Sequence, residues 1–317
     1  MRNELLKILA CPRCRGDLKI ENPIYREDHI WEGNLVCKRC KISFPIKNGV
    51  PRLLVTDDRD LRFIARAYGY LFLAYFKRKF EISTLYGITE DEEMQKFFSA
   101  LEITPQELEG KRILDAGCGV GRLIKNLSRY DAEIIGVDVH TAIEIPFQQS
   151  LTQKNVHVIQ ADLYHLPFSE KFDIIWCEGV LSYTRNPRKG FNRLSSFLKR
   201  NGKIYIWISG KSKHSFINYA RKFFKYSYRY PPHLIYILSK FLALLYIMGA
   251  FLIKRKYLFR KYRYLSFIFY NALLRKYEHH LHISEIKRWF KDEGIKIIKI
   301  SKHGIGITGI KVSDYNG

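Results

Sequence analysis

Residues 111–122 read KRILDAGCGVGR, and this stretch decides the fold. The apolar run 111–116 predicts a short strand, and the glycines at 117, 119 and 121 predict a tight turn into the apolar helix that starts at Leu123. Glycine lets the backbone approach a ligand closely because no Cβ stands in the way. A glycine pattern of this kind is weak evidence alone, so the strands that follow it carry the prediction.

Four more strands are predicted, over residues 134–138, 156–162, 172–178 and 203–208. The first ends at Asp138, 23 residues after Asp115, where a carboxylate accepts both ribose hydroxyls of a nucleotide. Helical patterns between the strands, one of them opening at Asn186-Pro187, indicate a parallel α/β sheet with a ligand at the carboxyl ends of its strands. The alternative, a nicotinamide dinucleotide enzyme, would usually have its third glycine one residue later.

The stretch LDAGCGVGR resembles very closely the first motif of class I S-adenosylmethionine-dependent methyltransferases. Residues 172–181, FDIIWCEGVL, resemble their fourth motif. The resemblance covers about residues 108–208, with a tail at 283–312. It implies an α/β fold, a Rossmann-like sheet with helices on both faces that closes with an antiparallel hairpin, and a methyltransferase activity.

The same resemblance assigns residues to the cofactor. Gly117 and Gly119 would let the methionine part of the cofactor pass close to the loop, and Asp115 would orient the loop and the cofactor's amino group. Asp138 would bind the ribose, with Val139 against the adenine. Asp162 and Leu163 would read the adenine edge. Cys118 is interpreted as a small buried filler rather than a nucleophile.

The catalytic residue is left unknown. Many relatives have Leu-His-His after the fourth strand, whereas this chain has Leu181-Ser182-Tyr183, so a histidine base at that place is not expected. In-line positioning supplies most of the acceleration of methyl transfer, and a base is needed only for an acceptor atom of high pKa. The candidates, each of which could equally be structural, are Glu178, Tyr183, His279, His280 and His282.

Two Cys-x-x-Cys pairs, separated by 22 residues, mark residues 1–55 as a zinc ribbon. Each pair places two thiolates on one side of a tight loop, and two such loops supply the four sulfurs of closed, structural Zn²⁺ coordination. The predicted metal ligands are Cys11, Cys14, Cys37 and Cys40. The stretch resembles the zinc-ribbon family that includes the small activating subunit of tRNA and release-factor methyltransferases, which implies a ribbon working beside a methyltransferase.

The remaining sequence divides into three parts. Residues 56–109 form a helical connector with capping boxes at Thr89 and Thr104, and in methyltransferases of this type such helices often cover the cofactor. Residues 110–210 and 281–317 form the methyltransferase domain. Residues 211–280 form an insertion too long for a simple connection, interpreted as two or three amphipathic helices.

The formal net charge of +23 is concentrated in this insertion, which holds 15 Lys and Arg and one acid. Such an imbalance indicates a polyanionic partner. At its centre, residues 234–253 form a 20-residue apolar stretch, long enough to span a membrane. A single span is excluded because the strands on either side belong to one sheet.

Three functions are consistent with these features. The first is methyl transfer to an amphiphilic or lipid-linked acceptor, with the insertion on an anionic membrane surface. The second is an RNA methyltransferase, for tRNA or rRNA, whose ribbon and basic insertion bind RNA. The third is a non-catalytic binding module. No signal peptide precedes the first cysteine pair, so we expect a cytoplasmic protein, peripheral on the inner face of the membrane under the first hypothesis. The acceptor and the oligomeric state are left unknown.

Overall fold

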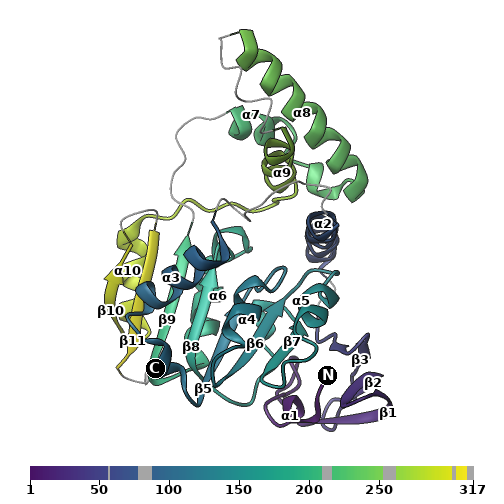
Figure 1. Ribbon diagram of the computed structural model, residues 1–317, viewed down its shortest axis with the longest axis vertical. Coiled ribbons are helices and arrows are strands. Elements are labelled where there is room, and N and C mark those ends of the chain that lie inside the picture. The colour runs from purple at the N-terminus through teal and green to yellow at the C-terminus, as the bar shows by residue number, and fades with distance from the viewer. Residues whose placement is uncertain (56–57, 78–87, 209–215, 253–261, 302–304, 313–317) are drawn as a thin grey trace.

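The computed structural model describes residues 1–55, 58–77, 88–208, 216–252, 262–301 and 305–312. A sheet of order β10-β11-β9-β8-β5-β6-β7 forms its centre (Figure 1). Strands β9, β8, β5, β6 and β7 run parallel, and β11 pairs antiparallel with both β9 and β10. This is the Rossmann-like sheet with a final antiparallel hairpin that the sequence predicted. The strands are β5 (Lys111–Ala116), β6 (Ala132–Asp138), β7 (Val156–Gln160), β8 (Phe172–Glu178), β9 (Leu198–Ile208), β10 (Ile295–Ile300) and β11 (Ile305–Lys311).

Both faces of the sheet are covered, because its strands carry apolar residues on alternate sides. Ile113 packs into one core and its neighbour Leu114 into the other. The first core lies under α3 (Glu90–Leu101), α4 (Arg122–Leu127) and α5 (Glu144–Gln149). The second lies under α6 (Pro187–Ser196), α10 (Ile283–Asp292) and the N-terminal ribbon.

The ribbon consists of α1 (Asn3–Leu6) and an antiparallel sheet of β1 (Leu18–Arg26), β2 (His29–Cys37), β3 (Ser43–Lys47) and β4 (Val50–Pro51). It lies beside β7, the edge strand of the large sheet (Figure 1). Leu53 N–H donates to the Gln160 carbonyl (2.8 Å), and Ala10 N–H donates to the Pro167 carbonyl (2.9 Å). Apolar side chains of the ribbon and of the large sheet form one continuous core. The ribbon is therefore fixed to the sheet.

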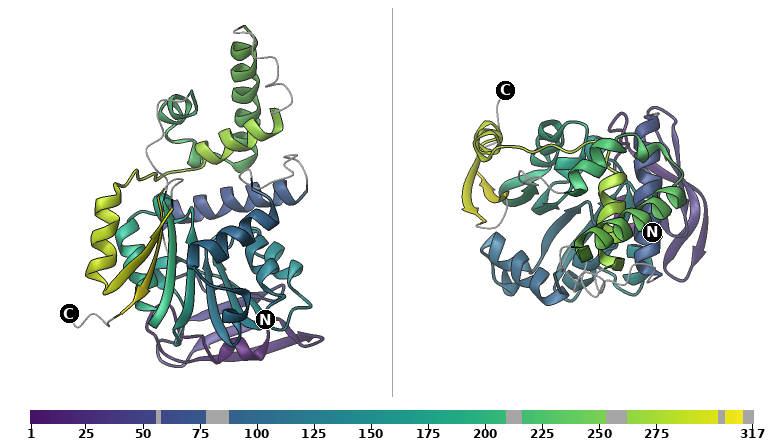
Figure 2. Two further views of the ribbon diagram at one scale, coloured as in Figure 1. Left: turned by 60° about the vertical axis from the view of Figure 1, so that its left-hand side comes forward. Right: turned by 90° about the horizontal axis from the view of Figure 1, so that it is seen from above.

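The connector begins with α2 (Arg59–Phe76), whose N-terminus is capped by Asp58. Both predicted capping boxes are present, at Thr89 before α3 and at Thr104 before the 3-10 helix η1 (Pro105–Leu108). Helix α2 lies across the ends of the parallel strands, between the sheet and the insertion (Figures 1 and 2). It therefore has the position expected of a cover over the ligand site.

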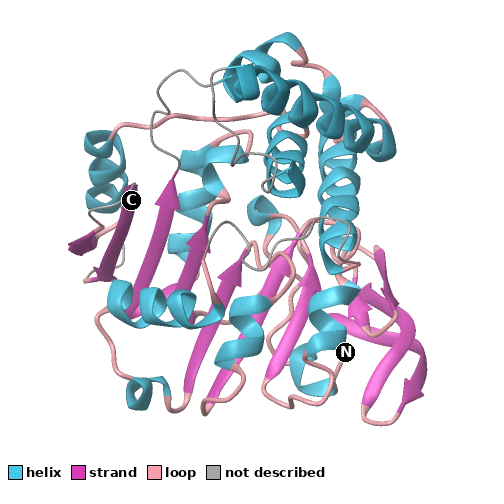
Figure 3. Cartoon of the chain, turned by 45° about the horizontal axis from the view of Figure 1, so that its top comes forward, coloured by secondary structure: helices cyan, strands magenta, loops and turns pink. Residues whose placement is uncertain are grey.

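The insertion forms α7 (Phe216–Phe223), η4 (Ser227–Arg229), α8 (Pro232–Leu252) and α9 (Tyr262–Leu273). These helices pack with α2 around a third core, above the end of the sheet (Figures 2 and 3). The predicted helical character is confirmed. Strands β9 and β11, which precede and follow the insertion, are direct neighbours, so α8 cannot cross a membrane as a single span.

Helix α8 has one packed and one exposed side. Among the described residues it is the helix long and apolar enough to cross a membrane, yet most of its apolar window is not buried. Ile235, Ala243 and Ile247 lie on the packed side. The exposed apolar side, called the α8 stripe below, follows a spacing of three and four residues and comprises Leu234, Ile237, Phe241, Leu244, Leu245 and Met248.

Helical spacing in the sequence predicts a single apolar side, free to meet a membrane, formed by Leu234, Ile237, Leu238, Phe241, Leu242 and Leu245. The prediction is wrong for Leu238, which packs against the third core, and for Leu242, which is 5% exposed and belongs to the packed side. A helix that is apolar all round has no polar face to fix its orientation, so its sequence period could not reveal which side is covered. The basic residues Lys254, Arg255, Lys256, Arg260 and Lys261 lie outside the described residues.

Candidate active site

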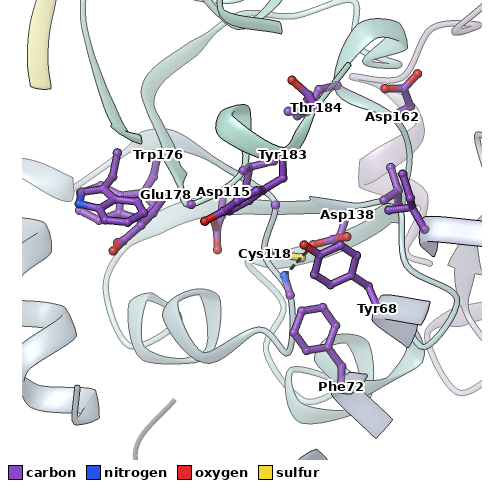
Figure 4. A pocket seen from close by; sticks show the side chains of 18 of the residues that line it. Tyr68, Phe72, Asp115, Cys118, Asp138, Asp162, Trp176, Glu178, Tyr183 and Thr184 are labelled. Atoms are coloured by element: carbon purple, nitrogen blue, oxygen red, sulfur yellow. Dashed lines mark hydrogen bonds between the residues drawn. The ribbon is translucent and has the colours of Figure 1, made fainter. Parts of the chain in front are cut away.

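A cavity of about 990 Å³ opens at the carboxyl ends of the parallel strands (Figure 4). Its wall combines the loop after β5, helices α2 and α3, the 3-10 helices η2 (Leu163–His165) and η3 (Leu181–Tyr183), and the end of α9. The residues that the sequence assigned to a cofactor all line it: Asp115, Gly117, Gly119, Asp138, Val139, Asp162 and Leu163. Their individual roles stay predictions.

The backbone of the glycine loop adopts a conformation that other residue types could take only with strain. Gly117 has φ +98°, and a Cβ there would lie 2.2 Å from Val180. Gly119 N–H donates to Asp138 Oδ2 (2.9 Å), and His140 N–H donates to Asp138 Oδ1 (3.1 Å). Asp138 therefore fastens the loop to the end of β6 while it faces the cavity.

Carboxyl groups gather in the half of the cavity beside this loop. Asp115 is 5% exposed, and burial together with the nearby carboxylates of Glu93, Asp138 and Glu178 holds its pKa well above the usual range. Two of these acids have cationic partners: Arg122 donates two hydrogen bonds to Glu93 (2.9 and 3.0 Å), and Lys96 pairs with Glu178. Asp115 and Asp138 have no such partner among the ion pairs of the described residues, so this half favours a cationic ligand.

Part of the cavity wall is formed by segments that sequence reasoning did not connect. The guanidinium of Arg275 lies over the Tyr183 ring, 4.0 Å from its centroid. Arg185, Lys189 and the buried Asn271 also line the cavity. The signal that could have found it is an asparagine within the apolar helix 262–273, since a buried amide needs a polar partner.

The candidate bases separate into two groups. Glu178 and Tyr183 line the cavity (Figure 4), whereas the three histidines are absent from the wall that the described residues form. His279 Nε2 lies 3.0 Å from the Thr184 carbonyl, and the His282 side chain caps α10. His279 and His282 therefore have structural contacts, and the catalytic role of Glu178 or Tyr183 stays a prediction.

The interpretation of Cys118 as a filler agrees with its surroundings. Its side chain is buried, and burial together with the carboxylates of Asp138 and Asp115 holds the pKa of its thiol well above the usual value. A thiol that resists ionisation is a poor nucleophile. Cys118 packs against Gly136, where an added Cβ would come within 3.1 Å of its sulfur.

The four ribbon cysteines meet as predicted, with their sulfurs within 4.8 Å of one another. Cys14 and Cys37 sulfurs are 3.4 Å apart, and those of Cys11 and Cys40 are 3.7 Å apart. Zn–S bonds of about 2.3 Å in a tetrahedron place sulfurs about 3.8 Å apart, so this set fits Zn²⁺. The two Cys-x-x-Cys turns have the same hydrogen bond. In each, the backbone N–H of the residue after the second cysteine donates to the carbonyl of the first cysteine.

Together, the strand order, the glycine loop and the acid-lined cavity define a Rossmann-like fold of the methyltransferase type. Comparison with known families agrees. Residues 114–206 match the family described as methyltransferase domain, and residues 2–49 match the family described as Trm112p-like protein. The chain thus contains a methyltransferase domain preceded by a Trm112p-like segment.

The individual proteins that this chain resembles have low sequence identity to it. A tRNA U34 carboxymethyltransferase of Campylobacter curvus is 28% identical over 179 residues, which cover 55% of this chain and 57% of that protein. The mitochondrial ubiquinone biosynthesis O-methyltransferase of Dictyostelium discoideum is 26% identical, over 35% of this chain and 39% of that protein. The chain therefore spans about half the length, or less, of these curated relatives. Magnesium protoporphyrin IX methyltransferase of Synechocystis, solved with bound S-adenosylmethionine, aligns with a TM-score of 0.48 at 15% identity, over 81% of this chain and all of that one.

Proposed function

We propose that this chain is an S-adenosylmethionine-dependent methyltransferase. The observation that carries the proposal is the cluster of carboxyl groups around Asp115. S-adenosylmethionine carries two cationic groups, an ammonium and a sulfonium, which carboxylates stabilise. The pyrophosphate of a nicotinamide dinucleotide, the alternative ligand of such a fold, would meet repulsion here.

The chain's own residues would bind and orient the cofactor. The Asp138 carboxylate would accept the ribose hydroxyls, and Asp115 would receive the ammonium group near the glycine loop. Asp162 already accepts a hydrogen bond from Tyr164 N–H (3.0 Å) and lies 2.8 Å from His165, so its remaining acceptor capacity would serve the adenine amino group. When bound, the cofactor supplies a methyl group on a good leaving group, so alignment of the acceptor is the main task left to the protein.

Cofactor affinity should rise with pH. Because the pKa of Asp115 is held above the usual 3.8, part of the unliganded protein carries a proton there above that pH. A cationic ligand favours the ionised carboxylate, so binding releases the proton and strengthens as the pH rises from 3.8 through the raised pKa of Asp115. Calorimetry in buffers of different ionisation enthalpy measures the proton release. Asp115→Asn should bind more weakly and lose the pH dependence, and a pH-independent wild type would contradict this role for Asp115.

The acceptor that we propose first is RNA, acted on in the cytoplasm. Relatives that share the methyltransferase domain include tRNA U34 carboxymethyltransferases. The insertion has a net charge of +14, from 15 basic residues and one acid, which suits a phosphate backbone. Arg185 and Lys189 line the cavity and would meet the phosphate groups of a nucleotide that enters it.

Mass spectrometry of RNA from cells with and without the gene tests this acceptor, supported by methyl transfer in vitro to the RNA that lacks the modification. A methylated nucleoside that disappears with the gene, and is restored by the purified protein, supports the proposal. Tight S-adenosylmethionine binding without transfer to RNA or lipid extracts would favour the non-catalytic binding module.

The α8 stripe favours a second candidate, an amphiphilic acceptor at an anionic membrane surface. Six large apolar side chains are exposed along this helix, on the side opposite its packed face. Lys222, Lys225 and Arg229, exposed near the start of α8, would lie close to acidic headgroups. Relatives with the same domain also include ubiquinone biosynthesis O-methyltransferases.

Liposome co-sedimentation at low and high salt tests the second candidate. If it is right, the wild type binds anionic vesicles with an apolar component that survives high salt, and Ile237→Asp/Phe241→Asp reduces binding by at least tenfold. Each full side-chain insertion contributes about 1.5–3 kcal/mol, so losing two exceeds that factor. The matched control is Lys222→Gln, which should weaken binding at low salt alone. Wild-type protein that binds RNA tightly and never sediments with vesicles would exclude this candidate.

A further inference from the structure

Two arginine side chains, one from the ribbon and one from α6, meet at a single backbone oxygen. Arg15 donates from Nη1 to the Leu166 carbonyl (3.0 Å), and Nη2 of Arg193 lies 3.5 Å from the same oxygen. Both guanidiniums also lie over the Phe197 ring, 5.1 and 4.7 Å from its centroid. Neither has a carboxylate partner among the ion pairs of the described residues. Two positive charges are therefore held side by side in this part of the chain.

The arginine pair can be reached by an anion from solvent. Arg15 is exposed, and Nη1 of Arg193 is neither enclosed by the protein nor hydrogen-bonded to any other described residue. Burial and the nearby charge of Arg15 both lower the pKa of Arg193. Like charges this close repel each other, and an anion bound to both would relieve the repulsion. Guanidinium groups bind phosphate particularly well, because several N–H donors lie in one plane.

The arginine pair belongs to a row of basic residues that begins at the cavity. Arg185 and Lys189 are exposed and line the cavity. Lys189 and Arg193 are four positions apart on α6, so they share one face of the helix. The Lys189 ammonium lies over the ring of Tyr164, which also lines the cavity, 5.7 Å from the ring centroid. The row therefore connects the cavity to the arginine pair.

The row continues onto the cysteine turns of the ribbon. Arg39 lies against Gly16, the residue after Arg15, because a Cβ on Gly16 would come 2.8 Å from the Arg39 Cβ. Residues 11–17 and 37–41 include five basic residues and one acid, so the turns stay positive even beside a doubly negative four-thiolate zinc site. Among the described residues, no large apolar side chain is exposed on these turns or on α6. Such a surface suits a phosphate backbone better than a lipid surface.

We propose that this row binds the phosphate backbone of the RNA whose target nucleotide enters the cavity. The row, called the α6–ribbon strip below, comprises Arg185, Lys189, Arg193, Arg15 and Arg39. The proposal rests on the proposed RNA acceptor and names a surface that would hold the flanking nucleotides. By contrast, Arg221 and Arg275 of the insertion share Glu278 as an ion-pair partner, so their charges are partly neutralised.

The experiment measures binding of a single-stranded dodecamer of uridines to the full chain saturated with S-adenosylhomocysteine. Arg193→Met removes the charge but keeps an unbranched chain against Phe197. It should weaken binding about fivefold and make the log–log salt dependence shallower by about 0.7. Arg193→Lys, which keeps the charge, should retain most of the affinity. Arg39→Gln, at the ribbon end of the strip, should resemble Arg193→Met and keep its zinc.

Lys47→Gln is the matched control. Lys47 is an exposed ribbon cation at the end of β3 that is farther from the cysteine turns, so this variant should bind the dodecamer like the wild type. Melting temperature and S-adenosylmethionine affinity are measured for every variant, and Arg193→Met should lower neither, because it removes a contact between like charges.

Two results would overturn the α6–ribbon strip and leave the RNA acceptor standing. One is an Arg193→Met protein that melts earlier yet binds the dodecamer like the wild type. The other is a Lys47→Gln protein that loses as much affinity as Arg39→Gln. A wild type that binds the cofactor but not the dodecamer would overturn both the strip and the RNA acceptor, and would leave the methyltransferase proposal standing.

Discussion

Replacing Cys37 with serine is expected to remove zinc and to unfold the ribbon. The binding free energy of structural zinc in small zinc-finger peptides is about 10–16 kcal/mol, and it appears as folding free energy. The Cys37 side chain is fully buried within the core that the ribbon shares with the large sheet. Loss of the metal should therefore lower the melting temperature of the whole chain as well as that of the ribbon.

Elemental analysis of protein purified without added metal, combined with thermal unfolding, checks this expectation. The wild type should hold one zinc per chain, and a strong chelator should lower its melting temperature. Cys177→Ala provides the control, because Cys177 is buried in β8 and outside the four-sulfur cluster. That variant should keep its zinc despite some loss of stability. Zinc at full occupancy in Cys37→Ser would contradict the four-cysteine site.

Asp138→Ala should lower S-adenosylmethionine affinity by about ten- to a hundredfold. The ribose hydroxyls lose a charged acceptor, which costs about 1.5–3 kcal/mol. The structure adds a second cause, because Asp138 also accepts the backbone N–H groups of Gly119 and His140. Without these contacts the glycine loop is less well ordered before the cofactor binds.

Isothermal calorimetry separates the two causes. Asp138→Asn keeps one oxygen acceptor and should lose less affinity than Asp138→Ala. Asp131→Ala, which removes an exposed acid outside the cavity wall, should bind like the wild type. Unchanged affinity in Asp138→Ala would refute the assignment of this cavity to the cofactor.

The elements that depend on local sequence were predicted well. The strand before the glycine loop and the capping boxes at Thr89 and Thr104 lie where the patterns place them. Each of these features is set by residues close together in the chain, where period and capping chemistry act directly. The two Cys-x-x-Cys turns were likewise predicted from residues close together in the chain.

Contacts between distant segments could not be predicted. The pairing of Leu53 with the Gln160 carbonyl and the stacking of Arg275 on Tyr183 join residues about a hundred positions apart, and no periodic pattern encodes them. The exposed side of α8 was misjudged at Leu242 because its partners on α9 decide which side is covered. The part of the cavity wall formed by Tyr183, Asn271 and Arg275 was missed for the same reason.

The covalent link between the ribbon and the sheet also affects how the two would be regulated. Were the ribbon a separate subunit, its occupancy would depend on its abundance and on competition from other enzymes that share it. Tethered through residues 52–55 to a surface that it already contacts, it has an effective local concentration on the order of millimolar or higher. Each methyltransferase domain then keeps its own ribbon at a fixed one-to-one stoichiometry, and the ratio of the two could not be changed by limiting the supply of the ribbon.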